Sequence, residues 1–412
     1  YVYRDFTESR SLYMSIIEKY DPRTVFGKTD ASDVEPPRIL IAPNRYVQGQ
    51  GVLDNLGRYL RVVPSRNPAI LISARGKNEL GPRLVKSLGQ EGIEPTFVIF
   101  NGECSALEIE RIVTLLKSKV AIDSLVAVGG GKCVDAGKSV AHRLSIPSII
   151  CPSLASNDAP CSALSVLYTP EGVSEGAEFF PWSPAFVIID TAIVAEAPVR
   201  YLVSGMGDAM ATWYEADTCF RNPKARTTVG ARPTLAARSI GELCAKTLFE
   251  YGVSSVQSVT NSVCDESLES VVEANTLLSG LGFESGGLAG AHAVAQSYTV
   301  IPHIQTNYLH GEMVAMGLLA QLALENRESE CEKVATFFAQ VGLPVNLSQV
   351  GLKGNVEDSL DEIVEAALNS SIIGNEPMEL NHSVLLDACL SAHKIGLEIA
   401  KQQGQEAFAA LH

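Results

Sequence analysis

The stretch that decides the fold is VGGGKCVDAGKS, residues 128–139, which has the pattern of a β-strand that runs into three glycines and then into a helix. Glycines let a backbone approach a pyrophosphate closely, and the N-terminus of the following helix offers free N–H groups and a partial positive charge. A tight turn without a ligand is the alternative for a glycine triplet alone. In its strand-to-helix setting, this stretch predicts a dinucleotide-binding turn.

Outward from this turn, short β-type runs alternate with amphipathic stretches of helical length between residues 38 and 152. Continuous apolar strands of this kind are typical of a parallel sheet that is covered by helices on both faces. Residues 163–190 predict a hairpin and a returning strand. The predicted strands are 38–42, 68–73, 95–100, 123–128 and 147–151, and the predicted helices are 52–60, 78–91, 105–119 and 133–144.

Beyond Pro198 the β-branched runs stop, and long helical patterns continue to the C-terminus. The sequence therefore predicts an N-terminal arm over 1–37, an α/β domain with a Rossmann-like parallel sheet over 38–196 and an all-helical domain over 197–412. We expect a ligand in the cleft between the two domains, outside the carboxyl ends of the strands.

Composition limits the function classes. The chain has 412 residues, 46% of them hydrophobic and 19% charged, which excludes a disordered or fibrous protein. The net charge of −15 disfavours nucleic acid and anionic membranes as partners and favours a small neutral substrate. No apolar run approaches the roughly 20 residues that span a bilayer. Nine cysteines without a C-x-x-C pair are typical of a reduced intracellular protein, in the cytoplasm or the mitochondrial matrix.

Two features qualify the nucleotide site. Gly131 with Gly137-Lys138-Ser139 resembles a P-loop that has one residue too many, and Asp135 would place a carboxylate inside the phosphate nest, so an NTPase is a minor hypothesis. The Rossmann pattern expects an acidic residue on the adenine ribose where a strand ends. The strand over 68–73 ends instead in Ala74-Arg75, which leaves the choice between NAD and NADP open.

Histidine is scarce, yet three of the seven histidines lie within nineteen residues: His292, His303 and His310. Imidazoles eighteen residues apart converge when consecutive helices pack across a short loop, which makes His292 and His310 candidate metal ligands. His303 is interpreted as an ordinary core or surface histidine. Asp208, among small apolar residues, is the best third ligand, with helix N-capping as its alternative role. One Asp and two His leave coordination positions open and suit zinc and ferrous iron alike.

These residues together resemble the glycerol dehydrogenases of the iron-containing (group III) alcohol dehydrogenase family, from about residue 38 to the end. The motifs that carry the resemblance are RYVQG (45–49), GGGK (129–132) with Asp135 and Lys138, SNDAPCSALSVLY (156–168), GDA (207–209), GFESGG (282–287) and HGE (310–312). The resemblance implies a dehydroquinate-synthase-like architecture and assembly into a homo-oligomer.

The resemblance also implies roles for individual residues. It places the metal, zinc in the glycerol dehydrogenases and iron in several relatives, on Asp208, His292 and His310. It places the polyol substrate against Asp158 and Phe283. It places the pyrophosphate of NAD on Gly130, Gly131, Lys132 and Asp135, and the nicotinamide half among Ser153, Ser156, Ser162, Leu164 and Tyr168. The family usually has an aspartate where Ala74 stands.

The reaction that follows is metal-dependent oxidation of glycerol to dihydroxyacetone, with short 1,2-diols as further substrates. The metal acts as a Lewis acid that lowers the pKa of the substrate hydroxyl, and hydride passes to the nicotinamide. The alternatives are another polyol dehydrogenase or aldehyde reductase, a dehydroquinate-synthase-like enzyme of the same fold, and a nucleotide-binding scaffold in which the histidines are only structural.

Overall fold

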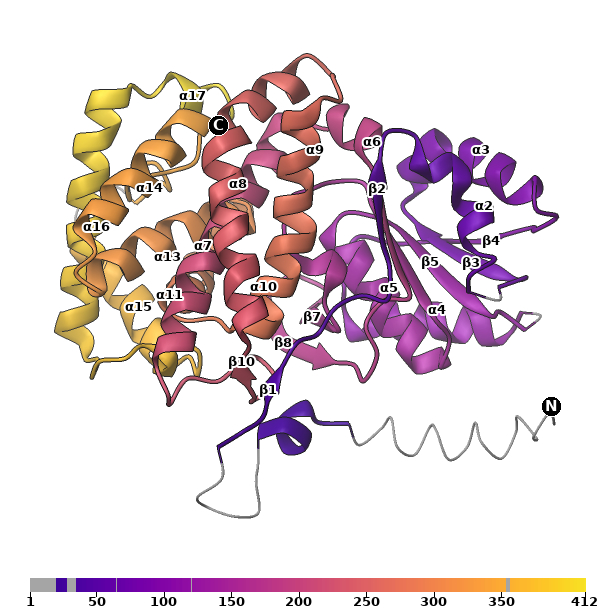
Figure 1. Cartoon of the computed structure of the whole chain (residues 1–412), viewed down its shortest axis with the longest axis horizontal. Coiled ribbons are helices and arrows are strands. Elements are labelled where there is room, and N and C mark those ends of the chain that lie inside the picture. Colours follow the sequence, from indigo (N-terminus) through magenta and orange to yellow (C-terminus); the bar gives the residue numbers. More distant parts are fainter. Residues whose placement is uncertain (1–19, 28–34, 64, 120, 353–355) are drawn as a thin grey trace.

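The computed structural model describes residues 20–27, 35–63, 65–119, 121–352 and 356–412. A parallel sheet with its helices forms one half of the molecule, and a bundle of helices forms the other (Figure 1). Most of the predicted arm over 1–37 lies outside the described residues. Within it, a short π-helical segment, η1 (Arg23–Gly27), packs through Gly27 against Gly230.

The central sheet has six strands, all parallel, in the order β2-β9-β6-β5-β3-β4. This confirms the predicted Rossmann-like sheet. The strands are β2 (Tyr46–Gly49), β3 (Pro68–Ile72), β4 (Thr96–Ile99), β5 (Ser124–Gly129), β6 (Ser148–Pro152) and β9 (Phe186–Asp190). The helices of this half are η2 (Val52–Asn55), α2 (Leu56–Tyr59), α3 (Ala74–Gly89), α4 (Ala106–Lys117) and α5 (Gly131–Leu144).

Both faces of the sheet are buried, which explains the uninterrupted apolar strands. In β3, Ile70 and Ile72 face α3, whereas Ala69 and Leu71 face α4 and α5. Successive side chains of a strand point to opposite faces, so every position of such a strand is apolar.

The prediction of a sheet strand over 38–42 is wrong. Only Arg38–Ile39 (β1) is extended and paired, and its partner is β10 (Arg232–Pro233) in the helical half. One edge strand of the sheet is β2, in which the Tyr46 hydroxyl donates to Gln48. Gln48 in turn donates to Glu269 on α9. Because these polar groups are satisfied by tertiary contacts, the apolar pattern did not reveal this strand.

A hairpin of β7 (Leu164–Tyr168) and β8 (Ser174–Phe179) precedes β9, as predicted for 163–190. The short helices η3 (Ala159–Cys161) and α6 (Thr191–Ala195) flank this region. β7 packs on α5, so the hairpin lies beside the helix that follows the glycine-rich turn.

The helical half is confirmed from α7 onward. Its helices are α7 (Val199–Arg221), α8 (Leu235–Thr260), α9 (Glu266–Glu273), η4 (Ala274–Leu278), α10 (Ser279–Gly286), α11 (Gly290–Ser297), η5 (Tyr298–Val300), α12 (Pro302–Asn307), α13 (His310–Leu324), α14 (Glu328–Val341), α15 (Val356–Leu368), η6 (Ile373–Asn375), α16 (His382–Gln403) and α17 (Glu406–Ala409). One continuous apolar core joins α7, α8, α13, α14 and α16 to the sheet residues Ala127 and Ile150.

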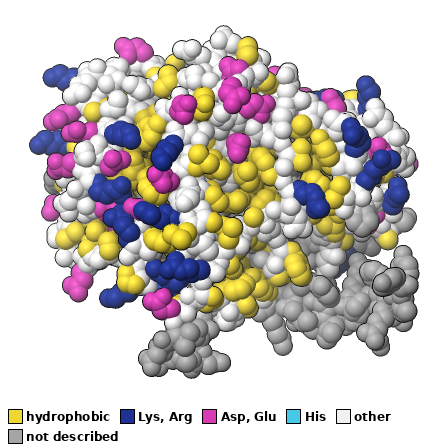
Figure 2. All heavy atoms as spheres, viewed as in Figure 1, with side chains coloured by type: hydrophobic (Ala, Val, Ile, Leu, Met, Phe, Trp, Pro, Cys, Tyr) yellow, Lys and Arg dark blue, Asp and Glu magenta, His cyan; other side chains and the backbone are white. Residues whose placement is uncertain are grey.

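The helices and one face of the surface bear on contact with a membrane or with a partner. None of the helices in the described residues is long and apolar enough to cross a membrane. Figure 2 shows that hydrophobic side chains gather near the centre of the displayed face, whereas most charged side chains lie around them.

Candidate active site

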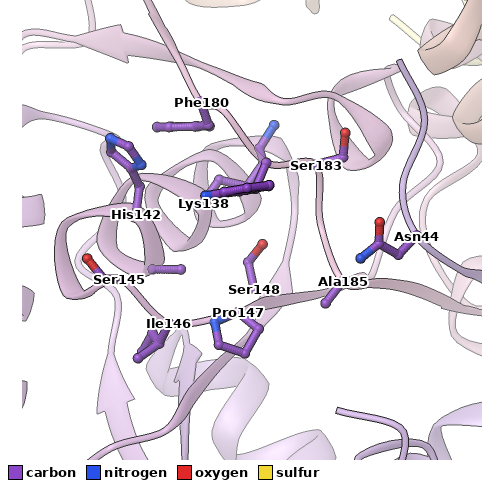
Figure 3. Close-up of a pocket in the computed structure, with 12 residues that line it drawn as sticks. Asn44, Lys138, His142, Ser145, Ile146, Pro147, Ser148, Phe180, Ser183 and Ala185 are labelled. Carbon is purple, nitrogen blue, oxygen red and sulfur yellow. The ribbon is translucent and has the colours of Figure 1, made fainter. Parts of the chain in front are cut away.

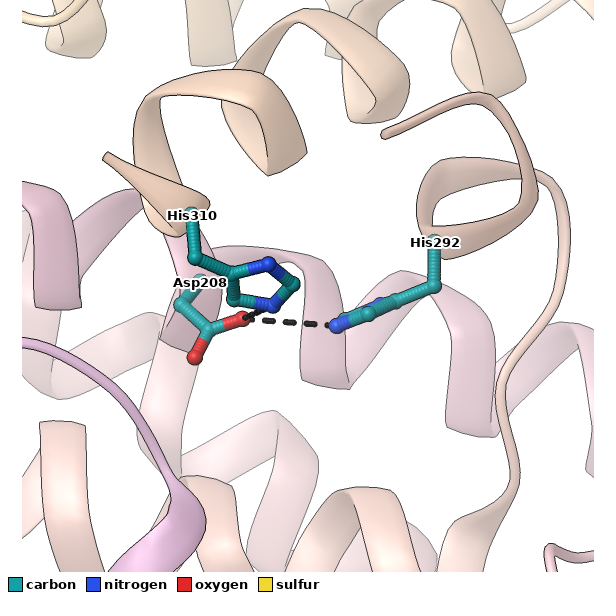
Figure 4. Close-up of side chains that lie close together, drawn as sticks. All are labelled: Asp208, His292 and His310. Carbon is teal, nitrogen blue, oxygen red and sulfur yellow. Dashed lines mark ion pairs between the residues drawn. The ribbon is translucent and has the colours of Figure 1, made fainter. Parts of the chain in front are cut away.

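Asp208, His292 and His310 converge, although they come from three different helices (Figure 4). The Nε2 atoms of His292 and His310 lie 3.3 and 3.4 Å from Oδ1 of Asp208. The candidate ligand atoms all lie within 4.8 Å of one another. Asp208 and His292 are buried, but the His310 side chain is 42% exposed, so the group opens toward solvent on that side.

Glycines beside two of these residues bring their helices together. A side chain on Gly207 would meet the carbonyl of Gly311, and a side chain on Gly311 would meet the carbonyl of Ser204. The backbones of α7 and α13 therefore touch beside Asp208 and His310. Only glycine permits this approach, because any Cβ would push the two helices apart.

The environment of Asp208 fits a cation. Its Oδ1 atom is buried and has no hydrogen-bond partner among the described residues, although two imidazole nitrogens face it. Burial raises the pKa of Asp208, but the imidazoles of His310 and His292 outweigh burial and hold that pKa below its usual value. A buried anionic oxygen with two convergent nitrogen donors is the donor set of a metal site with open positions.

Glu215 completes the surroundings of His292, and the sequence analysis missed it. Its Oε2 lies 2.6 Å from Nδ1 of His292, and its Oε1 accepts the backbone N–H of His292 at 2.9 Å. Glu215 lies seven residues after Asp208 on α7, two helical turns along the same face. This spacing was the one sequence signal that could have indicated a role for Glu215 beside Asp208.

Asp158 lies against Asp208, as expected for a residue at the mouth of the site. Its backbone N–H donates to Oδ2 of Asp208 at 3.2 Å, and its own Oδ2 accepts from the Ser279 hydroxyl at 3.3 Å. Burial and then the negative charge of Asp208 raise the pKa of Asp158 well above its usual value. The second acid therefore favours its neutral carboxyl form, which can exchange a hydrogen bond with a substrate hydroxyl.

Phe283 and Leu164 pack together in a small apolar cluster with Leu288. Phe179 from β8 covers this cluster. The residue predicted to line the polyol pocket therefore touches one predicted to surround the nicotinamide. An apolar wall of this kind excludes water from the space beside it.

The glycine-rich turn adopts the predicted strand-to-helix form. Gly130 precedes α5 and gives no side-chain cap, so the N-terminal N–H groups of the helix remain available to an anion. Gly131 also has a packing role, because a Cβ on it would lie 2.6 Å from the Asn157 side chain. Ser153 lies beside the turn, and its N–H donates to the carbonyl of Gly129 at 2.9 Å.

Lys132 and Tyr168 lie together at the edge of this turn. The Lys132 ammonium stands 5.3 Å from the centre of the Tyr168 ring and 2.6 Å from Oε1 of Glu103. Half of the Lys132 side chain is exposed, so it can reach an anion. Ser156 lies nearer the metal group, where its carbonyl accepts from Ser204 on α7 at 3.4 Å.

Asp135, Lys138 and Ser162 form a buried group behind the turn. Lys138 lies 2.9 Å from Oδ1 of Asp135 and donates to the carbonyl of Ala159 at 2.9 Å and to the Ser162 hydroxyl at 3.1 Å. The N–H of Val166 donates to Asp135. The Lys138 ammonium faces the protein interior and not the helix N-terminus, so this is no P-loop.

Ala74 and Arg75 begin α3 directly after β3, at the end of the sheet where the adenine ribose is expected. Ser73 caps this helix by accepting the N–H of Gly76. The Arg75 guanidinium is exposed and pairs with Glu79 at 2.7 Å. His303 lies on α12, outside the Asp208 group, in agreement with its interpretation as an ordinary histidine.

A cavity of about 300 Å³ lies elsewhere (Figure 3). Its wall includes Ser148, which begins β6, Ala185, which precedes β9, and Ser145, which ends α5. His142 and Phe180 lie along one side with ring centres 4.9 Å apart and ring planes tilted by 48°. The cavity is therefore at the amino ends of the strands, opposite the glycine-rich turn, and we assign it no part in the site.

Comparison with known proteins agrees with this geometry. Residues 43–191 match the model of the family described as iron-containing alcohol dehydrogenase. The chain is 42% identical to the glycerol dehydrogenase of Thermotoga maritima, over 86% of this chain and 97% of the relative. It is 37% identical to the glycolaldehyde reductase of Halobacterium salinarum, over 87% and 98%. The crystal structure of glycerol dehydrogenase from Schizosaccharomyces pombe superimposes with a TM-score of 0.85 at 35% identity, over 92% and 94%.

Proposed function

The chain belongs to the iron-containing alcohol dehydrogenase family, and from that premise we propose that it oxidises glycerol to dihydroxyacetone with NAD as the hydride acceptor. The observation that carries the proposal is the convergence of Asp208, His292 and His310 on one point, with Oδ1 of Asp208 unpaired among the described residues. Relatives that carry the name glycerol dehydrogenase match nearly their full length.

The metal, when bound, supplies a Lewis acid to the substrate hydroxyl, and NAD supplies the hydride acceptor. The chain's own residues prepare this chemistry. Asp158 places a buried carboxyl group next to Asp208, where it can hold a second hydroxyl of a polyol. Phe283 and Leu164 form an apolar wall that keeps water away from the reacting carbon. His310 leaves the group open to the substrate.

We propose zinc as the resident metal. One carboxylate and two imidazoles suit zinc and leave its remaining positions for the substrate. Ferrous iron fits the same donors, so metal analysis of the purified protein decides between them.

We propose that Gly130, Gly131 and Lys132 hold the pyrophosphate of NAD. The uncapped N-terminus of α5 and the half-exposed Lys132 ammonium support this. In this proposal, four residues border the nicotinamide half: Ser153, Ser156, Leu164 and Tyr168. Asp135 and Ser162 lie behind the turn and, through Lys138, fix the position of β7 and of the loop before it.

The test is the initial rate of glycerol oxidation with NAD and then with NADP, before and after chelation, with metal analysis of the same sample. We expect activity with NAD that chelation removes and zinc restores. His292→Ala should lose metal and activity, whereas His303→Ala should keep both. Full activity in the metal-free protein would overturn the proposal.

A second candidate is the reduction of a short hydroxyaldehyde, because the Halobacterium relative is named for glycolaldehyde reduction and is 37% identical to this chain. The same site would run the reaction in the opposite direction. A larger kcat/KM for glycolaldehyde with NADH than for glycerol with NAD would favour this candidate.

We also propose that residues 1–37, 38–196 and 197–412 form the arm and the two domains, and that the protein is an intracellular homo-oligomer, in the cytoplasm or the mitochondrial matrix. All nine cysteines are free thiols, which suits a reducing compartment. Leu235 and Leu243 are 68% and 52% exposed on α8 and offer apolar surface to a second copy. Light scattering of the purified protein tests the assembly.

A further inference from the structure

We propose that Glu215 is a positioning residue that fixes the ring orientation and the tautomer of His292, and thereby sets the metal affinity of the site. This inference rests on the proposed metal-dependent function. It concerns an interaction behind the metal group and not a further ligand.

Both carboxylate oxygens of Glu215 form hydrogen bonds at the N-terminal end of α11. Oε1 accepts the N–H of Ala289 at 2.7 Å and the N–H of His292 at 2.9 Å. Oε2 lies 2.6 Å from Nδ1 of His292. The side chain is fully buried, and within the described residues it forms no ion pair with Lys or Arg. Its negative charge is met only by the imidazole and by the N-terminus of the helix.

This arrangement determines where the imidazole carries its proton. A carboxylate only accepts hydrogen bonds, so Nδ1 of His292 must carry the hydrogen that it donates to Glu215. Nε2 of the neutral ring is then a bare lone pair, and it faces Oδ1 of Asp208 at 3.3 Å. A proton or a metal cation must lie between these two acceptors. Because Glu215 keeps the other ring hydrogen on Nδ1, a metal ion that displaces the proton meets Nε2 as a lone pair.

Charge balance supports the same conclusion. A divalent cation in contact with Asp208 leaves one positive charge in a buried region. The buried Glu215 carboxylate behind His292 compensates that charge through the polarised imidazole. Two neutral histidines and the carboxylates of Asp208 and Glu215 therefore make the loaded group electrically neutral, with Asp158 in the protonated form that burial and Asp208 favour.

Glu215→Gln tests this role because both oxygens of a carboxylate accept hydrogen bonds, whereas the amide of glutamine has one oxygen that accepts and one NH₂ group that donates. The two backbone N–H groups need an oxygen, so the amide oxygen of Gln stays where Oε1 lies now. The amide NH₂ then faces Nδ1 of His292 and donates to it. The ring proton moves to Nε2, where it points at the metal position. The shape and backbone contacts of the wild type are kept, but the lone pair is lost.

Glu376 provides the matched control. Its Oε1 accepts the N–H of Gly290 at 2.8 Å, so it holds the same end of α11. None of its described hydrogen bonds involves the imidazole. Glu376→Gln therefore changes the anchoring of the helix without changing the hydrogen bond on His292.

The experiment measures zinc dissociation constants by chelator competition for the wild type, Glu215→Gln and Glu376→Gln. We expect Glu215→Gln to bind zinc about 10- to 100-fold more weakly, as is typical when the outer partner of a ligating histidine is lost. Glu376→Gln should bind zinc as tightly as the wild type. Equal affinity in Glu215→Gln, or an equal loss in both variants, would overturn the role given to Glu215.

A second measurement reads the ring of His292 in the wild type itself. Ring ¹⁵N spectra of the zinc-loaded wild type, with His292 assigned by substitution, should show a protonated Nδ1 and a coordinated Nε2. Coordination through Nδ1 would refute the proposal. The two proposals fail separately, because zinc binding that depends on Glu215 without turnover of glycerol would reject the substrate and keep the positioning role.

Discussion

Glu376 follows η6, is 4% exposed and lies against the start of α11, and its ionisation opposes folding. Burial, and then the negative charge of Glu325, raise the pKa of Glu376 to about 8. Its Oε2 atom has no hydrogen-bond partner among the described residues, so no donor there stabilises a negative charge on it. The neighbouring buried carboxylate of Glu215 acts in the same direction.

The raised pKa of Glu376 makes the free energy of unfolding depend on pH. The folded-state pKa of Glu376 lies above its unfolded value of about 4.5, so between these values the folded protein binds more protons than the unfolded chain. This group therefore destabilises the fold progressively as the pH rises from about 4.5 to about 8. Glu376→Gln imitates the protonated acid, and we expect its unfolding free energy to fall less over this range.

Urea unfolding of both proteins at several pH values between 5 and 9 measures the effect. Glu379→Gln, which removes an exposed carboxyl three residues away, should keep the wild-type dependence. Parallel curves for the wild type and Glu376→Gln would contradict the prediction.

The sequence revealed the two histidines of the candidate site but not the glutamate behind one of them. His292 and His310 stood out because histidine is scarce, with seven in the chain. Glu215 did not, because it is one of 47 acidic residues and its one sequence signal is a spacing of seven residues from Asp208. Its function comes from a tertiary contact with a ring 77 residues away, which a local pattern does not contain.

At the scale of elements, the crossing of α7 and α13 should be intolerant of even one methyl group. A Cβ on Gly311 would stand 1.7 Å from the carbonyl oxygen of Ser204, so Gly311→Ala must move one backbone. The movement separates Asp208 from His310, although no ligand is removed. We expect lower thermal stability and markedly weaker zinc binding than in the wild type.

Gly89→Ala is the control for this prediction, because Gly89 ends α3 with open space around its Cβ position. Calorimetry and chelator competition on both variants give the two readouts. Wild-type zinc affinity in Gly311→Ala would show that the helix crossing does not set the distance between the ligands.

The buried ion pair between Lys138 and Asp135 on α5 should contribute to the stability of the fold. Lys138 and Asp135 are 2% and 7% exposed, and Lys138 also binds the carbonyls of Ala159 and Leu164. Lys138→Met leaves Asp135 buried without its counter-charge, which typically costs about 3–5 kcal/mol. Adding Asp135→Asn removes the stranded charge and should recover part of that loss.

A double-mutant cycle by urea unfolding measures this coupling. Additive losses in the double variant would mean that Lys138 acts through its carbonyl contacts alone. In either case the loop over 159–164 should become more mobile, since Lys138 is the group that gathers its carbonyls.

The elements also show why one strand was misplaced. The apolar run over 38–42 has the composition of a buried strand, yet Leu40 is 46% exposed and only Arg38–Ile39 pairs with another strand. The polar segment Tyr46–Gly49 enters the sheet because β9 and α9 satisfy it. Composition predicted the apolar strands, including the edge strand β4, but not the polar edge strand β2.

At the scale of the whole molecule, the candidate site combines residues from both halves. Asp158 comes from the loop after β6, whereas Asp208, His292 and His310 come from α7, α11 and α13. The sequence predicted the two halves and the residues that bridge them, because the motifs are local. It did not predict how closely the helices approach, which depends on packing around Gly207 and Gly311.

This assembly makes the metal a link between helices that are distant in sequence, so metal and fold should stabilise each other. A ligand that binds only the folded state adds RT ln(1 + [L]/Kd), or about 2.7 kcal/mol at a concentration one hundred times Kd. We therefore expect chelation to lower the apparent Tm by several degrees and zinc to restore it. His310→Ala should have a Tm that zinc no longer changes, because His310 is the exposed ligand and its loss leaves the core intact. If chelation left the Tm of the wild type unchanged, the three helices would hold their positions without the metal, and the group would be preformed by packing alone.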